Sequence, residues 1–215
     1  MQLIVITRPD IYEGETALVD RLFRLGMPRL HLRKPQASRE ELAAWIEQVD
    51  APFRIRIVLH DHHPLARDYH LGGIHLNSRC PDVPDWARTE RLTESFTKGL
   101  TNGLSECFTG GFTVSRSCHS LDEVVQHKAE CDYLILSPLF DSISKQGYGA
   151  AFAPEVIAEA RQQGIIDWQV YALGGISLER LPAVREMGFG GAAVLGDLWQ
   201  AKDPEERLRQ WLTLL

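Results

Sequence analysis

Two glycine-containing turns near the C-terminus constrain the fold more than any other feature of this chain. The first, Gly174-Gly175, follows the apolar run Tyr171-Ala172-Leu173 and precedes an amphipathic segment. Further along, Ala192-Ala193-Val194-Leu195-Gly196 repeats the arrangement. Glycine lets the backbone approach a ligand closely, and the free amides of a following helix favour an anion such as phosphate. Two such turns in succession are typical of the loops after strands seven and eight of a (β/α)₈ barrel.

Strand-like and helix-like segments alternate along the whole chain, which indicates an α/β fold with a parallel sheet. The strands are predicted at residues 3–7, 30–32, 55–59, 73–76, 112–115, 133–136, 169–172 and 191–194. The helices are predicted at 16–25, 64–69, 86–96, 121–128, 154–162, 178–187 and 204–212, with another opened by a Ser38/Glu41 capping box. These units predict a single-domain (β/α)₈ TIM barrel over residues 1–215. Residues 98–111 are predicted to be an extra loop or hairpin, whose role stays open.

The composition excludes several classes of protein. A formal net charge of −6 argues against a nucleic-acid-binding protein. The 4 cysteines form no C-x-x-C pair, and nothing in their spacing indicates a disulfide framework. No signal peptide and no apolar run long enough for a membrane span are visible. We therefore expect a cytoplasmic protein with no membrane or nucleic-acid partner, and the sequence leaves homo-oligomer formation open.

Residues able to bind an anion gather where the predicted strands end, which is where barrels of this type place their active site. Cations, hydroxyl groups and glycine turns that meet on one face are suited to a phosphorylated substrate. The predicted substrate- and phosphate-binding residues are His31, Arg33, Ser117, Ser142, Ser144, Lys145, Gly174, Gly175, Leu195 and Gly196.

His119 is the predicted catalytic residue, because it follows strand five and an imidazole can take and give a proton near neutral pH. The alternative is that His119 caps the next helix. The neighbouring Cys118 lacks an activating partner and is predicted to be a small buried residue. His60, His62 and His63 surround Asp61, but adjacent strand residues point to opposite faces. Asp61 as a magnesium ligand is therefore a better prediction than a zinc site.

These stretches resemble the thiamin phosphate synthase superfamily, and the match covers nearly the whole chain. The family motifs include Q-x-R-E-K after strand two, N-D after strand three, H-L-G-Q-E-D after strand four and S-x-H after strand five. T-P-T-K, A-I-G-G-I and a V-A-V-x-S-type turn follow. The matching stretches here are His31-Leu32-Arg33-Lys34-Pro35, His60-Asp61, His75-Leu76-Asn77-Ser78-Arg79-Cys80, Ser117-Cys118-His119, Ser142-Ile143-Ser144-Lys145, Ala172-Leu173-Gly174-Gly175-Ile176 and Ala193-Val194-Leu195-Gly196.

The departures from these motifs bear on the reaction. The resemblance implies that aspartates after strands three and four hold magnesium in the synthase. Asp61 is present, but the second position is Cys80, which offers no hard oxygen ligand. The superfamily also contains a thiazole tautomerase branch that needs no metal, and Arg116-Ser117-Cys118-His119-Ser120-Leu121-Asp122-Glu123 is similar to the R-S-V-H-S-L-E-E motif of that branch.

Three functions remain open, and we favour the first. The resemblance implies a thiazole tautomerase that acts on a phosphorylated thiazole carboxylate, with His119 as proton shuttle and no cofactor. The alternative is thiamin phosphate synthase, which joins a pyrimidine pyrophosphate to a thiazole phosphate with magnesium. The third is a non-catalytic barrel that binds phosphorylated ligands of thiamin biosynthesis.

Overall fold

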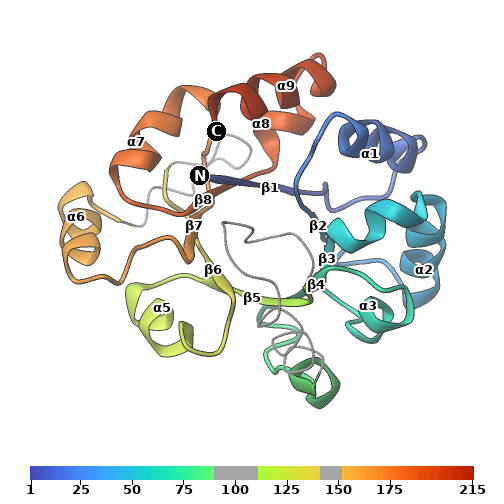
Figure 1. Cartoon of the computed structure of the whole chain (residues 1–215), viewed down its shortest axis with the longest axis horizontal. Coiled ribbons are helices and arrows are strands. Elements are labelled where there is room, and N and C mark those ends of the chain that lie inside the picture. The colour runs from blue at the N-terminus through green and yellow to red at the C-terminus, as the bar shows by residue number, and fades with distance from the viewer. Residues whose placement is uncertain (90–110, 141–151) are drawn as a thin grey trace, which may run out of the picture.

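Eight parallel strands close into a barrel in the computed structural model, which describes residues 1–89, 111–140 and 152–215 (Figure 1). Each strand pairs with its neighbours in chain order, and β8 returns to β1 with Leu3 opposite Ala192. The predicted (β/α)₈ TIM barrel is therefore confirmed. The strands are β1 (Gln2–Ile6), β2 (Leu30–Leu32), β3 (Ile57–Leu59), β4 (Gly73–Leu76), β5 (Thr113–Cys118), β6 (Tyr133–Leu136), β7 (Val170–Ala172) and β8 (Gly191–Val194).

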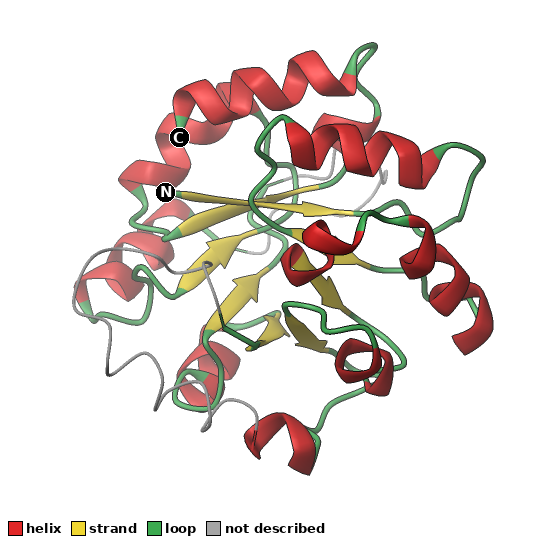
Figure 2. Ribbon diagram, turned by 45° about the vertical axis from the view of Figure 1, so that its right-hand side comes forward, coloured by secondary structure: helices red, strands yellow, loops and turns green. Residues whose placement is uncertain are grey.

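Helices surround the barrel and cover the outer face of the sheet (Figure 2). They are α1 (Glu15–Arg24), α2 (Arg39–Gln48), α3 (Pro64–Asp68), α5 (Leu121–His127), α6 (Pro154–Gln162), α7 (Leu181–Glu186), α8 (Gly196–Trp199) and α9 (Pro204–Leu214), with 3₁₀ turns η1 (Ala51–Arg56) and η2 (Leu178–Arg180). The Ser38 capping box is confirmed, since Glu41 N donates to Ser38 Oγ at 3.1 Å and Ser38 N to Glu41 Oε2 at 2.7 Å.

Two separate sets of apolar residues form the core. The larger set lies between the sheet and the helices and includes Leu3, Leu22 and Trp211. The smaller set fills the barrel interior and comprises Ile4, Ile6, Tyr133, Ile135, Tyr171 and Ala193. Polar residues complete the interior on the side of β2, β4 and β5, where His31, His75 and Ser115 are buried. The barrel interior is thus apolar on one side and polar on the other.

Three predicted elements differ from the structure for a local reason, and several other bounds are shifted by one or two residues. The strand predicted at 55–59 begins only at Ile57, because Pro52 starts the 3₁₀ turn η1, which continues through Arg56. The helix predicted at 178–187 begins as η2, since Pro182 has no N–H to donate to Leu178. The strand predicted to end at Ser115 continues to Cys118, where it pairs with β6.

Other predictions fall partly or wholly outside the described residues. Residues 85–89 are helical, in keeping with the start of the helix predicted at 86–96, and the remainder of that helix lies beyond the described range. The segment 98–111 also lies outside it, apart from Gly111. None of the helices in the described ranges has the length and apolar character needed to cross a membrane.

Candidate active site

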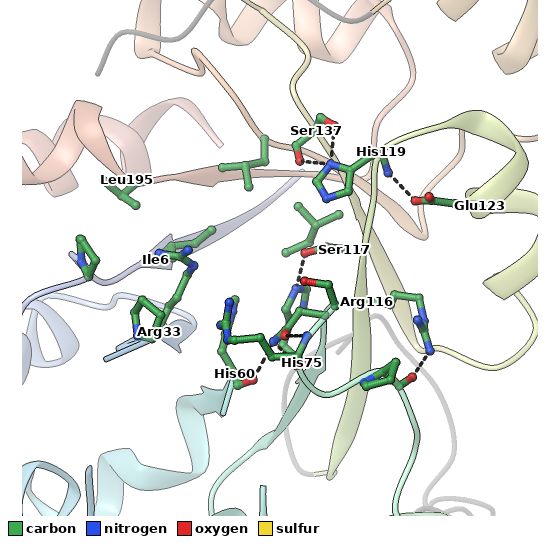
Figure 3. Close-up of a pocket in the computed structure, with 18 of the residues that line it drawn as sticks. Ile6, Arg33, His60, His75, Arg116, Ser117, His119, Glu123, Ser137 and Leu195 are labelled. Atoms are coloured by element: carbon green, nitrogen blue, oxygen red, sulfur yellow. Dashed lines mark hydrogen bonds between the residues drawn. The ribbon is translucent and has the colours of Figure 1, made fainter. Parts of the chain in front are cut away.

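A cavity of ≈1170 Å³ opens at the end of the barrel where the strands finish (Figure 3). All eight strands contribute to its wall with their last residues or with the residues that follow them. The lining residues are Ile6, Arg8, Pro9, Arg33, Pro35, His60, His75, Asn77, Ser78, Arg79, Pro81, Arg116, Ser117, His119, Glu123, Gln126, His127, Ile135, Ser137, Leu173, Leu195, Trp199 and Gln200.

Four guanidinium groups line the cavity: those of Arg8, Arg33, Arg79 and Arg116. Glu123 is the only carboxylate among the described lining residues. Burial lowers the pKa of Arg33, and the nearby positive charge of Arg79 lowers it further. Guanidinium groups that face one another across a cavity repel each other, and a bound anion relieves this repulsion. The wall is therefore suited to an anionic ligand such as a phosphate, because one guanidinium group can donate two parallel hydrogen bonds to two phosphate oxygens.

Two of these guanidinium groups are engaged by carboxylates, Arg8 by Asp10 at 2.7 Å and Arg79 by Asp61 at the rim of the cavity. Arg79 donates from Nε to Asp61 Oδ1 at 2.8 Å and from Nη2 to Asp61 Oδ2 at 3.0 Å. Asp61 follows β3, and its side chain is only 12% exposed. Arg79 follows β4, in a tight turn closed by two backbone hydrogen bonds between Asn77 and Cys80. Both oxygens of the Asp61 carboxylate are thus bound by one residue.

The floor of the cavity consists of packed imidazole rings. His60 and His75 are stacked with ring centroids 4.1 Å apart, and His31 lies beneath them at 5.1 and 5.2 Å. Burial lowers the pKa of His75 to about 3 and holds the pKa values of His31 and His60 well below the usual value. All three rings are therefore neutral at neutral pH.

These imidazoles form hydrogen bonds with one another and with hydroxyl groups. His31 Nδ1 lies 2.9 Å from His60 Nε2, and His31 Nε2 lies 2.7 Å from the Tyr133 hydroxyl. His75 contacts Ser115 Oγ at 2.9 Å and Ser117 Oγ at 2.7 Å. The three rings have nitrogen atoms within 4.8 Å of one another, as a metal site would need. Since both nitrogens of His31 and of His75 already have partners, we assign the cluster as a hydrogen-bond network.

His119 stands at the wall directly after β5 and is solvent-exposed (Figure 3). Its Nδ1 lies 3.0 Å from the backbone oxygen of Ser137. A carbonyl oxygen only accepts, so Nδ1 carries a proton, and in the neutral ring Nε2 has the free lone pair. The backbone N–H of His119 donates to Glu123 Oε2 at 2.7 Å, which fixes the backbone beside the ring. This arrangement suits a general base.

Comparison with known proteins agrees with this geometry. The family model described as Thiamine monophosphate synthase matches residues 2–198. The chain belongs to the thiamine monophosphate synthase family. It is accordingly an enzyme of thiamin biosynthesis, as the resemblance of its motifs implied.

Curated relatives and solved structures support this family assignment. The chain is 29% identical to Thiamine-phosphate synthase of Bacteroides fragilis, over 88% of this chain and 87% of the relative. It is 30% identical to Thiamine-phosphate synthase of Rhizobium etli, over 90% of this chain and 88% of the relative. The crystal structure of thiamine phosphate pyrophosphorylase from Bacteroides thetaiotaomicron superposes with a TM-score of 0.79 at 32% identity, covering 100% and 97% of the two chains.

Thiamine-phosphate synthases use magnesium, and the described residues at the two positions expected to hold it, Asp61 and Cys80, do not fit that ion. The carboxylate predicted as a ligand, Asp61, has both oxygens bound to Arg79. The second expected carboxylate is Cys80, whose thiol has a pKa raised by burial. A neutral thiol is a poor ligand for a hard cation. The Asp61 side chain is therefore engaged in an ion pair with Arg79, and the reaction proposed below uses no metal ion bound by Asp61.

The structure brings several predicted site residues to the cavity and leaves others elsewhere. Arg33, Ser117, His119 and Leu195 line it. His31 is fully buried below the floor and reaches the cavity only through His60. Gly174, Gly175 and Gly196 follow β7 and β8, beside the lining residues Leu173 and Leu195. Ser142, Ser144 and Lys145 lie outside the described residues.

The sequence reasoning missed Arg8 and Arg79 as cavity cations. Arg8 follows β1 by two residues, so the rule that placed Arg33 at a strand end would also have found it. Arg79 stands where the family motif has a glutamate, and only the fold shows that it reaches Asp61. Cys118 is fully buried, which confirms the prediction of a small buried residue, and burial raises the pKa of its thiol to about 12.

Proposed function

We propose that this chain is a thiazole tautomerase, an isomerase that moves a proton on a phosphorylated thiazole carboxylate. The observation that carries the proposal is the orientation of His119. Its Nδ1–H donates to the Ser137 carbonyl, so in the neutral ring Nε2 carries the lone pair, at the wall of a cavity lined by guanidinium groups. A base beside an anion-binding wall suits proton transfer within a phosphorylated substrate.

In this reaction His119 Nε2 removes a proton from one carbon of the substrate and returns it to another. One C–H bond breaks and one forms, the ring double bonds shift between them, and no electron is gained or lost overall. The Ser137 carbonyl holds the ring in place and stabilises the imidazolium that exists between the two steps. Such acid–base catalysis contributes on the order of 10²–10⁴ in rate.

The phosphate of the substrate is proposed to lie between the turns after β7 and β8. Gly174 and Gly175 have positive φ values of 100° and 62°, which turn backbone amides in a way that few residues other than glycine allow. Arg8 follows β1, which pairs with β8, so its guanidinium comes from the strand next to the Leu195-Gly196 turn. Arg33 would neutralise the substrate carboxylate or phosphate from the adjacent strand β2.

Thiamin phosphate synthase is the second candidate, and the names of the relatives favour it over the tautomerase. Two curated relatives and a solved structure carry that activity in their names. The cavity of ≈1170 Å³ is also large for a single small substrate. Against it stand the Asp61–Arg79 pair and Cys80, which leave pyrophosphate without the expected metal ligands. The local geometry therefore supports the tautomerase, and the family names support the synthase.

One assay separates these candidates. The purified protein is supplied with the phosphorylated thiazole carboxylate alone, or with thiazole phosphate and pyrimidine pyrophosphate, each with EDTA or with magnesium. Isomerisation of the carboxylate in EDTA supports the tautomerase. Release of pyrophosphate only with magnesium would replace it by the synthase. Binding without turnover of either set would make the chain a non-catalytic module.

A further inference from the structure

We infer that Lys34 is a positioning residue of the cavity. Its buried ammonium group holds the loop between β1 and α1, residues 7–14, so that the Arg8 guanidinium stands at the cavity wall ready to bind an anion. Arg8 and Arg33 belong to the described lining residues, and Lys34 does not. This role deepens the proposed function and rests on its phosphate-binding part, so it is tested by anion binding and not by turnover.

The Lys34 side chain points away from the cavity and toward helices α1 and α2. Lys34 directly follows Arg33 at the end of β2, and neighbouring residues of an extended chain point to opposite sides. Its side chain is fully buried, and Nζ lies 2.6 Å from Glu15 Oε1 in α1. The other oxygen of that carboxylate accepts from Trp45 Nε1 in α2 at 2.9 Å. Lys34 therefore acts on a ligand only through its neighbours.

The ammonium group of Lys34 binds the β1–α1 loop at two backbone carbonyls. Its three N–H groups have three acceptors: Arg8 O at 2.9 Å, Asp10 O at 2.5 Å and Glu15 Oε1 at 2.6 Å. A buried charge is costly unless hydrogen bonds satisfy it, and here two of the three bonds depend on the loop. The loop therefore cannot move without leaving the ammonium group unsatisfied.

These bonds determine where the Arg8 side chain stands. Fixed carbonyls at Arg8 and Asp10 fix the backbone from which that side chain extends. Within the same loop, Arg8 Nη2 donates to Asp10 Oδ2 at 2.7 Å, and the guanidinium carbon lies 4.7 Å from the centre of the Tyr12 ring. Among the described residues, Arg8 Nη1 has no hydrogen-bond partner. The loop thus holds the guanidinium in one orientation and leaves Nη1 to donate to an anion.

A second set of bonds joins the same loop to Arg33. The backbone N–H of Arg33 donates to Thr7 Oγ1 at 2.9 Å, and that hydroxyl donates to the Arg33 carbonyl at 3.1 Å. Thr7 precedes Arg8 and Arg33 precedes Lys34, so these two cavity cations come from one cross-linked unit. Arginine side chains that are ordered before binding lose less conformational entropy when a phosphate binds. Lys34 therefore raises anion affinity without contacting the anion.

The test is the affinity of the full chain for thiazole phosphate after both charges of the buried pair are removed. Glu15→Gln/Lys34→Met leaves no buried charge without its partner, and glutamine keeps an oxygen acceptor for Trp45. We expect Kd by calorimetry to rise about 3- to 10-fold, because the Arg8 side chain is then ordered only on binding. An affinity equal to that of the wild type would overturn the inference, and so would a wild-type protein that binds no thiazole phosphate.

Lys128 provides a matched control at the other end of the barrel. Its Nζ donates to the carbonyls of Gly164 and Ile165 at 2.7 and 3.0 Å and pairs with Asp167 Oδ2 at 2.8 Å, before β7 begins. None of these four residues is among the described lining residues. Lys128→Met/Asp167→Asn should therefore alter stability and leave Kd unchanged. Equal losses of affinity in the two double variants would mean a general loosening of the barrel and would overturn the role of Lys34.

A mutant cycle with Arg8→Gln shows whether Lys34 acts through Arg8. Arg8→Gln alone should weaken binding, and adding Glu15→Gln/Lys34→Met should then cause little further loss, since the side chain that Lys34 positions is gone. Independent losses that multiply would show that Lys34 acts by another route and would overturn the inference. An ion pair that served stability alone would lower the free energy of unfolding in every background and leave Kd unaffected.

Nitrogen relaxation in the ligand-free wild-type protein tests the loop without any substitution. We expect backbone order parameters of about 0.85 at Arg8 and Asp10, as in rigid elements, because Lys34 binds both carbonyls. Values below about 0.6 would show a mobile loop and overturn the inference. Thiazole phosphate carries the phosphate that both candidate reactions share, so the absence of isomerase activity would not alter any of these measurements.

Discussion

Arg79 holds both carboxylate oxygens of Asp61, with Nε–Oδ1 at 2.8 Å and Nη2–Oδ2 at 3.0 Å. The two residues come from the ends of β3 and β4, so the closed barrel brings them together. A guanidinium thereby lies against the carboxylate that a divalent cation would need. The ion pair is neutral overall, so the Asp61 charge is already balanced by the Arg79 side chain.

The first prediction concerns divalent metal. We expect no Mn²⁺ binding by electron paramagnetic resonance to the wild-type protein at 1 mM, because Asp61 is already paired. The Arg79→Gln/Cys80→Asp variant frees one carboxylate and adds another, so it should gain binding. Arg79→Gln/Cys80→Ser is the control, since it frees Asp61 without adding a carboxylate. Tight Mn²⁺ binding to the wild-type protein would show that the pair opens for a metal.

The second prediction concerns Arg33 as an anion-binding residue. Replacement by Gln should weaken binding of thiazole phosphate roughly 10- to 100-fold, since a charge-assisted hydrogen bond contributes about 1.5–3 kcal/mol. Arg39→Gln is the control, because Arg39 forms an exposed ion pair with Asp68 on the outer surface. Calorimetry gives both affinities. Equal affinity of the two variants would place the phosphate elsewhere.

The third prediction concerns the turn at Gly174. With φ at +100°, a β-carbon there would lie 2.8 Å from the backbone of Pro138. Gly164 has φ of +72° and open space around it, so it is a matched control. Gly164→Ala should cost about 1–2 kcal/mol of unfolding free energy from strain alone. Gly174→Ala should cost about 1–3 kcal/mol more because of the clash, and equal losses in urea denaturation would contradict this.

The strand pattern was predictable because each strand is a short apolar run between turn residues. The strands at 30–32, 73–76, 133–136 and 191–194 match the prediction residue for residue. β5 extended further than predicted because its last residues are polar, and polarity suggested a loop. In the closed barrel Ser115 and Ser117 form hydrogen bonds to His75, so polar residues belong inside this strand.

The sequence predicted the site only through the rule that functional residues of a barrel lie where its strands end. Arg33, Ser117 and His119 were predicted in this way, and all three line one cavity. It could not show which side chains bind each other, since the partners are far apart in the chain. Lys34 follows Arg33 directly, yet it turns away and forms a buried ion pair with Glu15 at 2.6 Å. The network of His31, His60 and His75 likewise required the register of β2, β3 and β4.

The fourth prediction concerns acid. His75 has a folded-state pKa of about 3, and those of His31 and His60 are also well below the usual value because of burial. Unfolded histidines titrate near 6.5, so below about pH 6.5 the unfolded chain binds protons that the folded chain excludes. Their contribution to stability is complete above that pH and decreases below it, by up to about 1.4 kcal/mol per pH unit for each ring.

Urea denaturation at pH 7.5, 6.5, 5.5 and 4.5 measures this loss. His75→Gln removes one of the buried titrating rings, so its stability should fall less steeply between pH 6.5 and 4.5 than that of the wild type. An identical slope in the variant would mean that His75 is not held neutral in the folded protein.

The most direct test of the account is the turnover of the phosphorylated thiazole carboxylate by His119→Asn. Asparagine retains an N–H donor for the Ser137 carbonyl but has no basic nitrogen. We predict that kcat falls by about 10²–10⁴, while KM changes little because the cations that bind the phosphate are intact. A variant that retains nearly full kcat on this substrate would remove His119 from the mechanism and contradict the proposed tautomerase.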